Sequence, residues 1–167
     1  YDEHPNRWVR RVLGNKLDPL VRRAAAVCVG NPYLAAYMTA HGARVVHEIP
    51  TVVDLNRYVV APPPDGEFFR IGWIGTPATT KYLSGVIDVL REVQKVLALK
   101  LVTIGASPLG EIGLPLEQHP WTEDSEVALL GTVHAGIMPL PDAPWERGKC
   151  GYKLIQYMAC GLPVVAS

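Results

Sequence analysis

Apolar and polar positions follow one another along the chain in blocks, and each block has the length of one strand or one helix. Nearly continuous apolar runs are typical of strands that are buried on both faces, and the chain has four of them, at 68–75, 100–105, 134–140 and 163–167. Between these runs lie stretches with helical spacing. The alternation predicts a Rossmann-like α/β fold, in which helices cover both faces of a parallel sheet.

The stretch 80–98 shows the helical period most clearly. Apolar residues at helical spacing are expected to face the core, and they are Val86, Leu90, Val93 and Leu97. Asp88, Arg91, Glu92 and Lys95 should face water. A shorter helix is predicted within 123–133, with Glu123 or Asp124 as its N-cap, and a third begins near Gly151.

The first part of the chain has the same alternation with shorter elements. A helix within 17–27 should lead into a strand, and Asn31 followed by Pro32 is a typical helix start. This helix is expected to end at Gly42. The stretch 44–50 reads as a strand, followed by a connector.

A proline-rich stretch at 61–67, APPPDGE, is the strongest candidate for a domain boundary. Three prolines with a glycine and two acids are incompatible with the interior of a sheet. The sequence therefore predicts a division into residues 1–60, a linker at 61–67 and a domain at 68–167.

Ligands of parallel sheets bind beyond the carboxyl ends of the strands. In this chain those ends are expected in four loops, at 75–81, 105–113, 119–122 and 139–151.

The loop at 139–151 leads into a stretch that is suited to bind phosphate. Lys149, Lys153, Gln156 and Cys160 are spaced by four, three and four residues, so they are expected on one side of a helix or on the continuation of its line into the preceding loop. A helix start carries unpaired N–H groups and the positive end of the dipole. Two lysines and two glycines beside it favour an anion site, although an ordinary solvated helix has the same pattern.

The first loop, GWIGTPATTKYL, is a second turn suited to an anion. Gly75, Thr76 and Lys81 lie between a strand and a helix start, and Thr79 or Thr80 is equally expected to cap that helix. The turn matches neither the dinucleotide fingerprint nor the P-loop pattern. Two such turns on one sheet edge favour a diphosphate more than either does alone.

Composition limits the alternatives. Sixteen basic and sixteen acidic residues cancel, which argues against nucleic acid as a partner. No apolar run approaches the roughly 20 residues that span a bilayer, and we expect no signal peptide. The three cysteines, Cys28, Cys150 and Cys160, fit neither a disulfide framework nor a zinc site, which favours a reducing, cytoplasmic setting.

Motifs for other chemistry are missing from the sequence. There is no D-x-D pair for a metal-dependent donor site, no G-x-S-x-G, and no evident Cys–His pair. We therefore expect no metal and no cofactor, and no catalytic residue is assigned. The glycine fingerprint of a dehydrogenase is also absent.

Three stretches together resemble the family 4 (group 1) glycosyltransferases of the GT-B fold. They are VVHEIPTVVDLNRY, RIGWIG followed by a lysine, and the closing HAGIMPLPDAPWERGKCGYKLIQYMACGLPVVAS, and the resemblance runs from about residue 25 to the end. It implies that residues 68–167 form most of a nucleotide-sugar-binding lobe. Residues 1–60 would then be the tail of the acceptor-binding lobe and the connector between the lobes.

The resemblance also assigns roles. Members of the family commonly carry two glutamates separated by seven residues, and these positions are Gly148 and Gln156 here. Gln156 would bind the ribose, and the backbone from Tyr152 through Lys153 and Leu154 to Ile155 would hold the diphosphate.

Further assignments concern charge and the base. Lys81 matches the family's lysine, and Lys149 and Lys153 would replace an arginine that is missing near Thr76. Backbone from Pro120 to Thr122 is expected to contact the nucleobase. Asp142 and Glu146 are candidates to touch the sugar.

The resulting hypothesis is a hexosyltransferase that is retaining and metal-independent. Its donor would be a nucleotide-diphosphate sugar and its acceptor a glycan, a lipid-linked molecule or a small molecule. Peripheral membrane association would come through the rest of the acceptor lobe, and the chain by itself is expected to be inactive. Alternatives are a non-catalytic nucleotide-sugar-binding or scaffold module, favoured by the missing glutamates, and a sugar-nucleotide epimerase of related fold.

Overall fold

The computed structural model describes residues 6–167, and the chain divides into two compact units. The first unit consists of Tyr1–Thr51 together with Asp142–Cys150. The second consists of Val52–Pro141 together with Gly151–Ser167. The chain therefore leaves the second unit at Asp142 and returns to it at Gly151, and we call 142–150 the returning segment.

The division between the units lies earlier than the boundary predicted at 61–67. The connector after Val52 packs on the second unit, where Tyr58 is buried. A Cβ on Gly161 would lie 2.8 Å from Val60, and one on Gly131 would lie 3.2 Å from Ala61. The prolines thus lie within the second unit, because the residues just before them are packed against it.

The first unit contains short elements around a small parallel sheet. The elements are α1 (Arg7–Leu13), α2 (Asp18–Arg23), β1 (Val27–Val29), α3 (Pro32–Ala40), β2 (Val46–Glu48) and α6 (Pro144–Arg147), with β1 paired to β2. The predicted start of α3 is confirmed, since Asn31 Oδ1 accepts a hydrogen bond from the Leu34 N–H at 2.8 Å. Asn31 Nδ2 donates to the carbonyl oxygens of Arg147 and Lys149, each at 3.2 Å, and so holds the returning segment.

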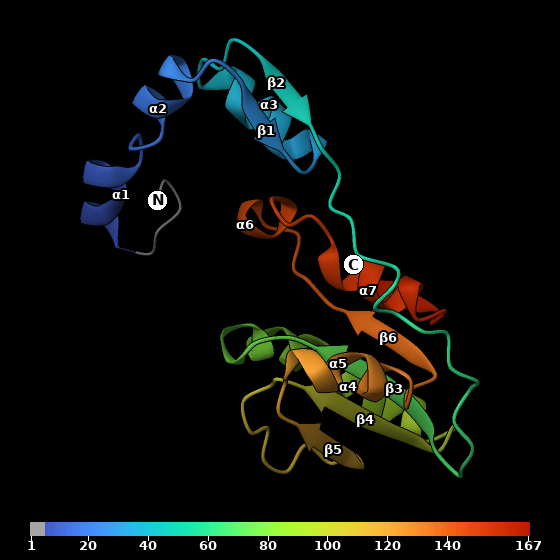
Figure 1. Cartoon of the computed structure of the whole chain (residues 1–167). Helices are drawn as coiled ribbons and strands as arrows, with labels where there is room; N and C mark the ends of the chain where they lie inside the picture. Colours follow the sequence, from blue (N-terminus) through green and yellow to red (C-terminus); the bar gives the residue numbers. More distant parts are fainter. Residues whose placement is uncertain (1–5) are drawn as a thin grey trace. The chain divides into compact units, whose positions relative to one another are not determined.

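The second unit contains a five-stranded parallel sheet in the order β5-β4-β3-β6-β7. Figure 1 labels β5, β4, β3 and β6 of this sheet. The strands are β3 (Phe69–Ile74), β4 (Leu99–Ile104), β5 (Leu116–His119), β6 (Ala135–Met138) and β7 (Val164–Ala166). Four of them coincide with the apolar runs of the sequence. The predicted Rossmann-like fold class is confirmed.

Helices cover the two faces of this sheet. They are η1 (Pro77–Leu83), α4 (Ser84–Gln94), α5 (Glu123–Leu130) and α7 (Tyr152–Ala159). Side chains alternate across a strand, so Trp73 packs with Leu90 of α4 in one core cluster. Ile74 packs with Leu130 of α5 and Tyr157 of α7 in the other.

Some local predictions are wrong. Helix α4 ends at Gln94, so Leu97 lies beyond it and is 43% exposed instead of buried. The N-cap of α5 is Thr122, whose hydroxyl accepts from the Ser125 N–H at 3.1 Å, and the predicted caps Glu123 and Asp124 lie in the first turn. Strand β5 is not marked by an apolar run, because its polar residues interrupt the pattern, although its end at His119 falls at the loop predicted at 119–122.

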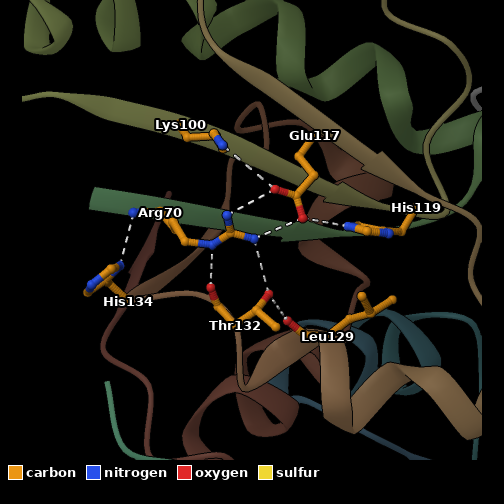
Figure 2. A network of polar contacts seen from close by, with 7 residues as sticks. All are labelled: Arg70, Lys100, Glu117, His119, Leu129, Thr132 and His134. Atoms are coloured by element: carbon orange, nitrogen blue, oxygen red, sulfur yellow. Dashed lines mark hydrogen bonds and ion pairs between the residues drawn. The ribbon is translucent and has the colours of Figure 1, made fainter. Parts of the chain in front are cut away.

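A polar cluster holds β5 at the edge of the sheet (Figure 2). The guanidinium of Arg70 donates two hydrogen bonds of 2.9 Å to the Glu117 carboxylate. His119 Nε2 lies 2.7 Å from the same carboxylate and Lys100 Nζ lies 3.9 Å from it. The hydrogen bonds from Arg70 and then from His119 lower the pKa of Glu117 to about 2.

Candidate functional site

Helix α7 is fixed to the sheet by Tyr157. The ring is fully buried, and its hydroxyl accepts a hydrogen bond from the backbone N–H of Ile74 at 2.9 Å. The hydroxyl also lies 3.4 Å from the carbonyl oxygen of Gly72 and 3.3 Å from that of Ile137. The ring lies against Gly136, where a Cβ would approach to 2.4 Å. These contacts set the position of α7 against β3 and β6.

The start of α7 lies close to the carboxyl end of β3. Gly151 precedes the helix in the left-handed conformation, with φ of 65°, which glycine adopts without strain. The Lys153 ammonium lies 4.9 Å from the centroid of the Trp73 ring. Because Trp73 is the penultimate residue of β3, this contact brings the α7 lysine to the turn that follows the strand.

The turn after β3 is packed against the same ring. Gly75 is buried, and a Cβ there would lie 2.1 Å from the Trp73 side chain. The next residue, Thr76, is exposed and starts η1. Its N–H donates to Thr79 Oγ1 at 2.9 Å, so this helix starts earlier than the predicted cap at Thr79 or Thr80. Gly75 and Lys153 therefore both lie against the buried indole of Trp73, and Thr76 follows Gly75 directly in the chain.

Two further loops meet at this edge of the sheet. Gly105 follows β4 with φ of 80°, and a Cβ there would lie 2.3 Å from the Gly75 carbonyl oxygen and 2.9 Å from Trp121. Thr80 Oγ1 accepts from the Ser107 N–H at 2.9 Å. The ends of β3, β4 and β5 thus meet at the carboxyl edge where a ligand was predicted.

The other predicted phosphate ligands are placed differently. Lys81 is exposed, and its ammonium lies 5.3 Å from the ring centroid of Tyr82. Lys149 belongs to the first unit, where its ammonium lies 3.9 Å from the Glu146 carboxylate. Of the two positions that the sequence allows for Lys149, on the helix or in the loop before it, the structure has the loop, because α7 begins at Tyr152.

The two acids that were considered for the sugar also lie in the first unit. Asp142 is held by Arg147, whose guanidinium donates two hydrogen bonds, of 2.6 and 2.9 Å, to its carboxylate. These bonds lower the pKa of Asp142. Glu146 and Gly148 belong to the same returning segment.

Gln156 lies in a buried polar network of the second unit. Its Nε2 donates to Glu126 Oε1 at 2.6 Å and to the Tyr58 hydroxyl at 3.1 Å. Trp121 Nε1 donates to Glu126 Oε2 at 2.6 Å, although the Trp121 residue is 50% exposed. Burial is the main cause that raises the pKa of Tyr58. Burial, followed by the charge of Glu126, likewise raises the pKa of Cys160, which is 2% exposed.

The backbone at the start of α7 contains the remaining predicted contacts. Tyr152 is exposed and Leu154 is partly buried. The Leu154 and Ile155 N–H groups both point to the Gly151 carbonyl oxygen, at 2.9 and 3.4 Å. The first N–H groups of a helix have no earlier carbonyl within the helix to bind, so Tyr152 and Lys153 carry the donors suited to an anion.

Sequence reasoning missed Trp73, Tyr157 and Glu126. Trp73 and Tyr157 read as ordinary apolar core residues, and nothing local distinguishes them. Glu126 does carry a signal, since it precedes the buried Leu130 by one helical turn and therefore points to the core. A carboxylate on that face requires buried hydrogen-bond donors.

Neither a metal centre nor a membrane span is found among the described residues. Within residues 6–167, no three His, Cys, Asp or Glu side chains gather in a way that could hold a metal ion. Over the same residues, no helix has the length and apolar character needed to cross a membrane.

Comparison with known proteins identifies the fold. No protein-family model matches the chain, and no curated protein matches its sequence. Solved structures do match. Anabaena HepE, crystallised with UDP and glucose, superposes with a TM-score of 0.71 at 19% identity over 91% of this chain. The fold is that of part of a GT-B glycosyltransferase.

Two other glycosyltransferases give the same result. TarM superposes with a TM-score of 0.67 at 16% identity over 92% of this chain. The pneumococcal O-GlcNAc transferase GtfA, crystallised with UDP and GlcNAc, superposes with a TM-score of 0.63 at 13% identity over 90%. The chain spans 47% of the HepE chain and 31% of TarM and GtfA.

Proposed function

We propose that the second unit binds the nucleotide diphosphate of a sugar donor, as part of a glycosyltransferase. The observation that carries this proposal is the position of Lys153, whose ammonium lies over Trp73 beside the Gly75–Thr76 turn. A cation, the first N–H groups of α7 and a glycine turn converge at the carboxyl edge of a parallel sheet. Such an edge is where ligands of these folds bind.

The chemistry needed for transfer agrees with these groups. When a nucleotide-diphosphate sugar reacts, negative charge develops on the diphosphate that leaves. The positive end of the α7 dipole and the Lys153 ammonium would stabilise that charge electrostatically. We therefore propose a transferase that needs no metal ion. Retention of the anomeric configuration is proposed from the resemblance of the closing stretch to group 1 enzymes.

The structures with bound ligand support the donor class. HepE and GtfA were both crystallised with UDP and a sugar. We propose by analogy that the donor here is a UDP-hexose and that the acceptor is a glycan, a lipid-linked molecule or a small molecule. Loops that surround the base are expected from Pro120 to Thr122, where the exposed Trp121 ring offers an aromatic surface.

Calorimetric titration of the chain with UDP, GDP and ADP tests the proposal. We expect one of the three to bind, and Lys153→Met to weaken that binding about tenfold, which corresponds to about 1.4 kcal/mol. Lys95→Met is the matched control, because Lys95 follows α4 and pairs with Glu92 at the surface. Absence of heat with all three diphosphates would contradict the proposal.

A non-catalytic binding module is the second candidate. It is favoured by Gly148, which offers no side chain where the resembled family has a glutamate that contacts the donor sugar, and which lies in the returning segment. The two candidates differ in turnover. Release of free sugar or transfer from a UDP-sugar by the protein that contains this chain would support the enzyme. Binding of donor without either reaction would support the module.

A further inference from the structure

Three hydrogen-bond donors converge on the buried carboxylate of Glu126. The Tyr58 hydroxyl, at 3.0 Å, and Gln156 Nε2, at 2.6 Å, both donate to Oε1. Trp121 Nε1 donates to Oε2 at 2.6 Å. Glu126 is 4% exposed and Gln156 is 3% exposed, so water hardly competes for these bonds. An ionised carboxylate can only accept hydrogen bonds, so Glu126 is the acceptor at each of these three contacts.

This arrangement determines which way the Gln156 amide faces. A glutamine amide has two N–H donors and one carbonyl acceptor. Both donors of Gln156 are used, one by Glu126 and one by the Tyr58 hydroxyl. A flipped amide would place its carbonyl oxygen against the Glu126 carboxylate, and two acceptors would then face each other at 2.6 Å. The network therefore excludes the flipped orientation.

The carbonyl oxygen of Gln156 makes no hydrogen bond within this network. Across the described part of the chain, no hydrogen bond reaches Gln156 Oε1. This oxygen is also not among the fully buried side-chain atoms that lack a partner, a set that contains only Gln94 Oε1 for residues 6–167. It therefore keeps contact with solvent, at the end of an otherwise buried side chain.

We propose that Glu126 is a positioning residue, which fixes the Gln156 amide so that Oε1 accepts a hydrogen bond from a hydroxyl of the nucleotide's ribose. The inference rests on the proposed function, because it assumes that the second unit binds a nucleoside diphosphate. Tyr58 and Trp121 complete the support by donating hydrogen bonds to Oε1 and Oε2 of Glu126, respectively. The site should therefore bind a ribose that carries this hydroxyl more tightly than a deoxyribose that lacks it.

The same contact explains why position 156 is a glutamine. Glu126 Oε1 lies 2.6 Å from the Gln156 side chain. A glutamate at position 156 would place a second carboxylate at that distance in a buried site, where two like charges strongly oppose each other. Glutamine presents the same acceptor oxygen to a ligand without a second charge. The effect of a substitution at one of these two positions should therefore depend on the residue at the other. The test is to exchange the carboxylate and the amide between the two positions.

The experiment compares UDP with 2′,3′-dideoxy-UDP by calorimetry, together with thermal unfolding of each variant. For the native chain we expect UDP to bind about tenfold more tightly, which is the scale of one hydrogen bond to a buried acceptor. Glu126→Gln should bring the ratio near one, since the amide introduced by this substitution can present its own N–H and allow the Gln156 amide to turn over. Glu123→Gln, on the exposed side of the same helix, should leave the ratio unchanged.

The exchanged pair keeps the proposal testable if Glu126→Gln fails to fold. Gln156→Glu should lower the unfolding temperature, and the double variant Glu126→Gln with Gln156→Glu should recover both the temperature and a ratio of at least about tenfold. If the native chain binds UDP but the ratio stays the same in Glu126→Gln, or falls to one in the folded double variant, the positioning role is refuted and the proposed function stands. If neither UDP, GDP nor ADP binds the native chain, both are refuted.

Discussion

The hydroxyl of Tyr157 in α7 accepts a hydrogen bond of 2.9 Å from the backbone N–H of Ile74 in β3. Two residues 83 apart in the chain are thereby joined inside the core. Ile74 is the last residue of its strand and Gly75 begins the candidate phosphate turn. The bond therefore links the helix that carries Lys153 to the strand end that carries Gly75, so it sets the geometry of the site.

Removal of this hydroxyl should destabilise the second unit. Tyr157→Phe keeps the ring but leaves the buried Ile74 N–H without this partner, which costs about 1–3 kcal/mol. Chemical denaturation monitored by circular dichroism measures the loss. Tyr33→Phe, at an exposed position, should change the unfolding free energy by less than about 0.5 kcal/mol. Equal effects of the two substitutions would show that the hydrogen bond contributes nothing.

Gly136 provides the space for the Tyr157 ring. Gly136→Ala would place a Cβ 2.4 Å from the ring, and both the ring and β6 are held in the core. We expect a loss of about 1–3 kcal/mol from overpacking. Gly85→Ala is the matched control, because its Cβ meets no atom within 4 Å in helix α4. That substitution should raise stability by about 0.5–1 kcal/mol. Thermal unfolding of both variants decides, and a neutral Gly136→Ala would contradict the packing argument.

The Glu117 cluster should make stability depend on acidity. The pKa of Glu117 is about 2 in the folded protein, against an ordinary value of 4.5, because Arg70 and His119 bind the ionised form. A lowered pKa in the folded state stabilises the fold above pH 4.5, and this contribution is lost as the pH falls from 4.5 toward 2. In Glu117→Gln that part of the pH dependence should disappear.

Denaturant unfolding at several pH values between about 2 and 6 tests the role of Glu117. Glu92→Gln is the control, since Glu92 makes an exposed pair with Lys95 in the same unit. We expect the control to retain the acid-dependent loss of stability. A Glu117→Gln protein whose unfolding free energy keeps the native slope between pH 4.5 and 2 would rule out this carboxylate as the cause.

The conformation of Gly151 should matter for the start of α7. Gly151 has φ of 65°, so Gly151→Ala is expected to cost about 1–2 kcal/mol of backbone strain. Because the strain falls where the first N–H groups of α7 are presented, UDP binding should weaken as well. Gly148→Ala is the control, since Gly148 has φ of −72° and its Cβ would meet only ordinary contacts.

Calorimetry and thermal unfolding of the two glycine variants give the comparison. Weaker UDP binding in Gly151→Ala, with native binding in Gly148→Ala, is the expected outcome. If both variants bind UDP as the native chain does, the geometry at the start of α7 is irrelevant to the ligand. If Gly148→Ala alone loses binding, the returning segment matters more than the helix start.

Much of the fold is predictable from local sequence, because its causes are local. Asn31 followed by Pro32 starts α3 through a side-chain cap and a preset φ, and both lie within one turn of chain. The apolar runs that become β3, β4 and β6 reflect strands that are largely buried in the sheet. The run that becomes β7 predicts a buried strand as well, but β7 lies at the sheet edge and Val165 is 68% exposed. Strand β5 has no apolar run of its own, since its polar residue Glu117 is stabilised by Arg70, a partner 47 positions away.

Tertiary structure decided which of the candidate ligand-binding residues lie close to one another. The sequence by itself determined the α/β class, the start of α7 at Gly151 and the residue types that suit a diphosphate. Only the folded chain put Lys153 over Trp73, placed Lys149 in the other unit and set Gln156 against Glu126. The physical reason is that helix and strand periods specify which face a side chain takes, whereas its partner depends on elements far away in the sequence.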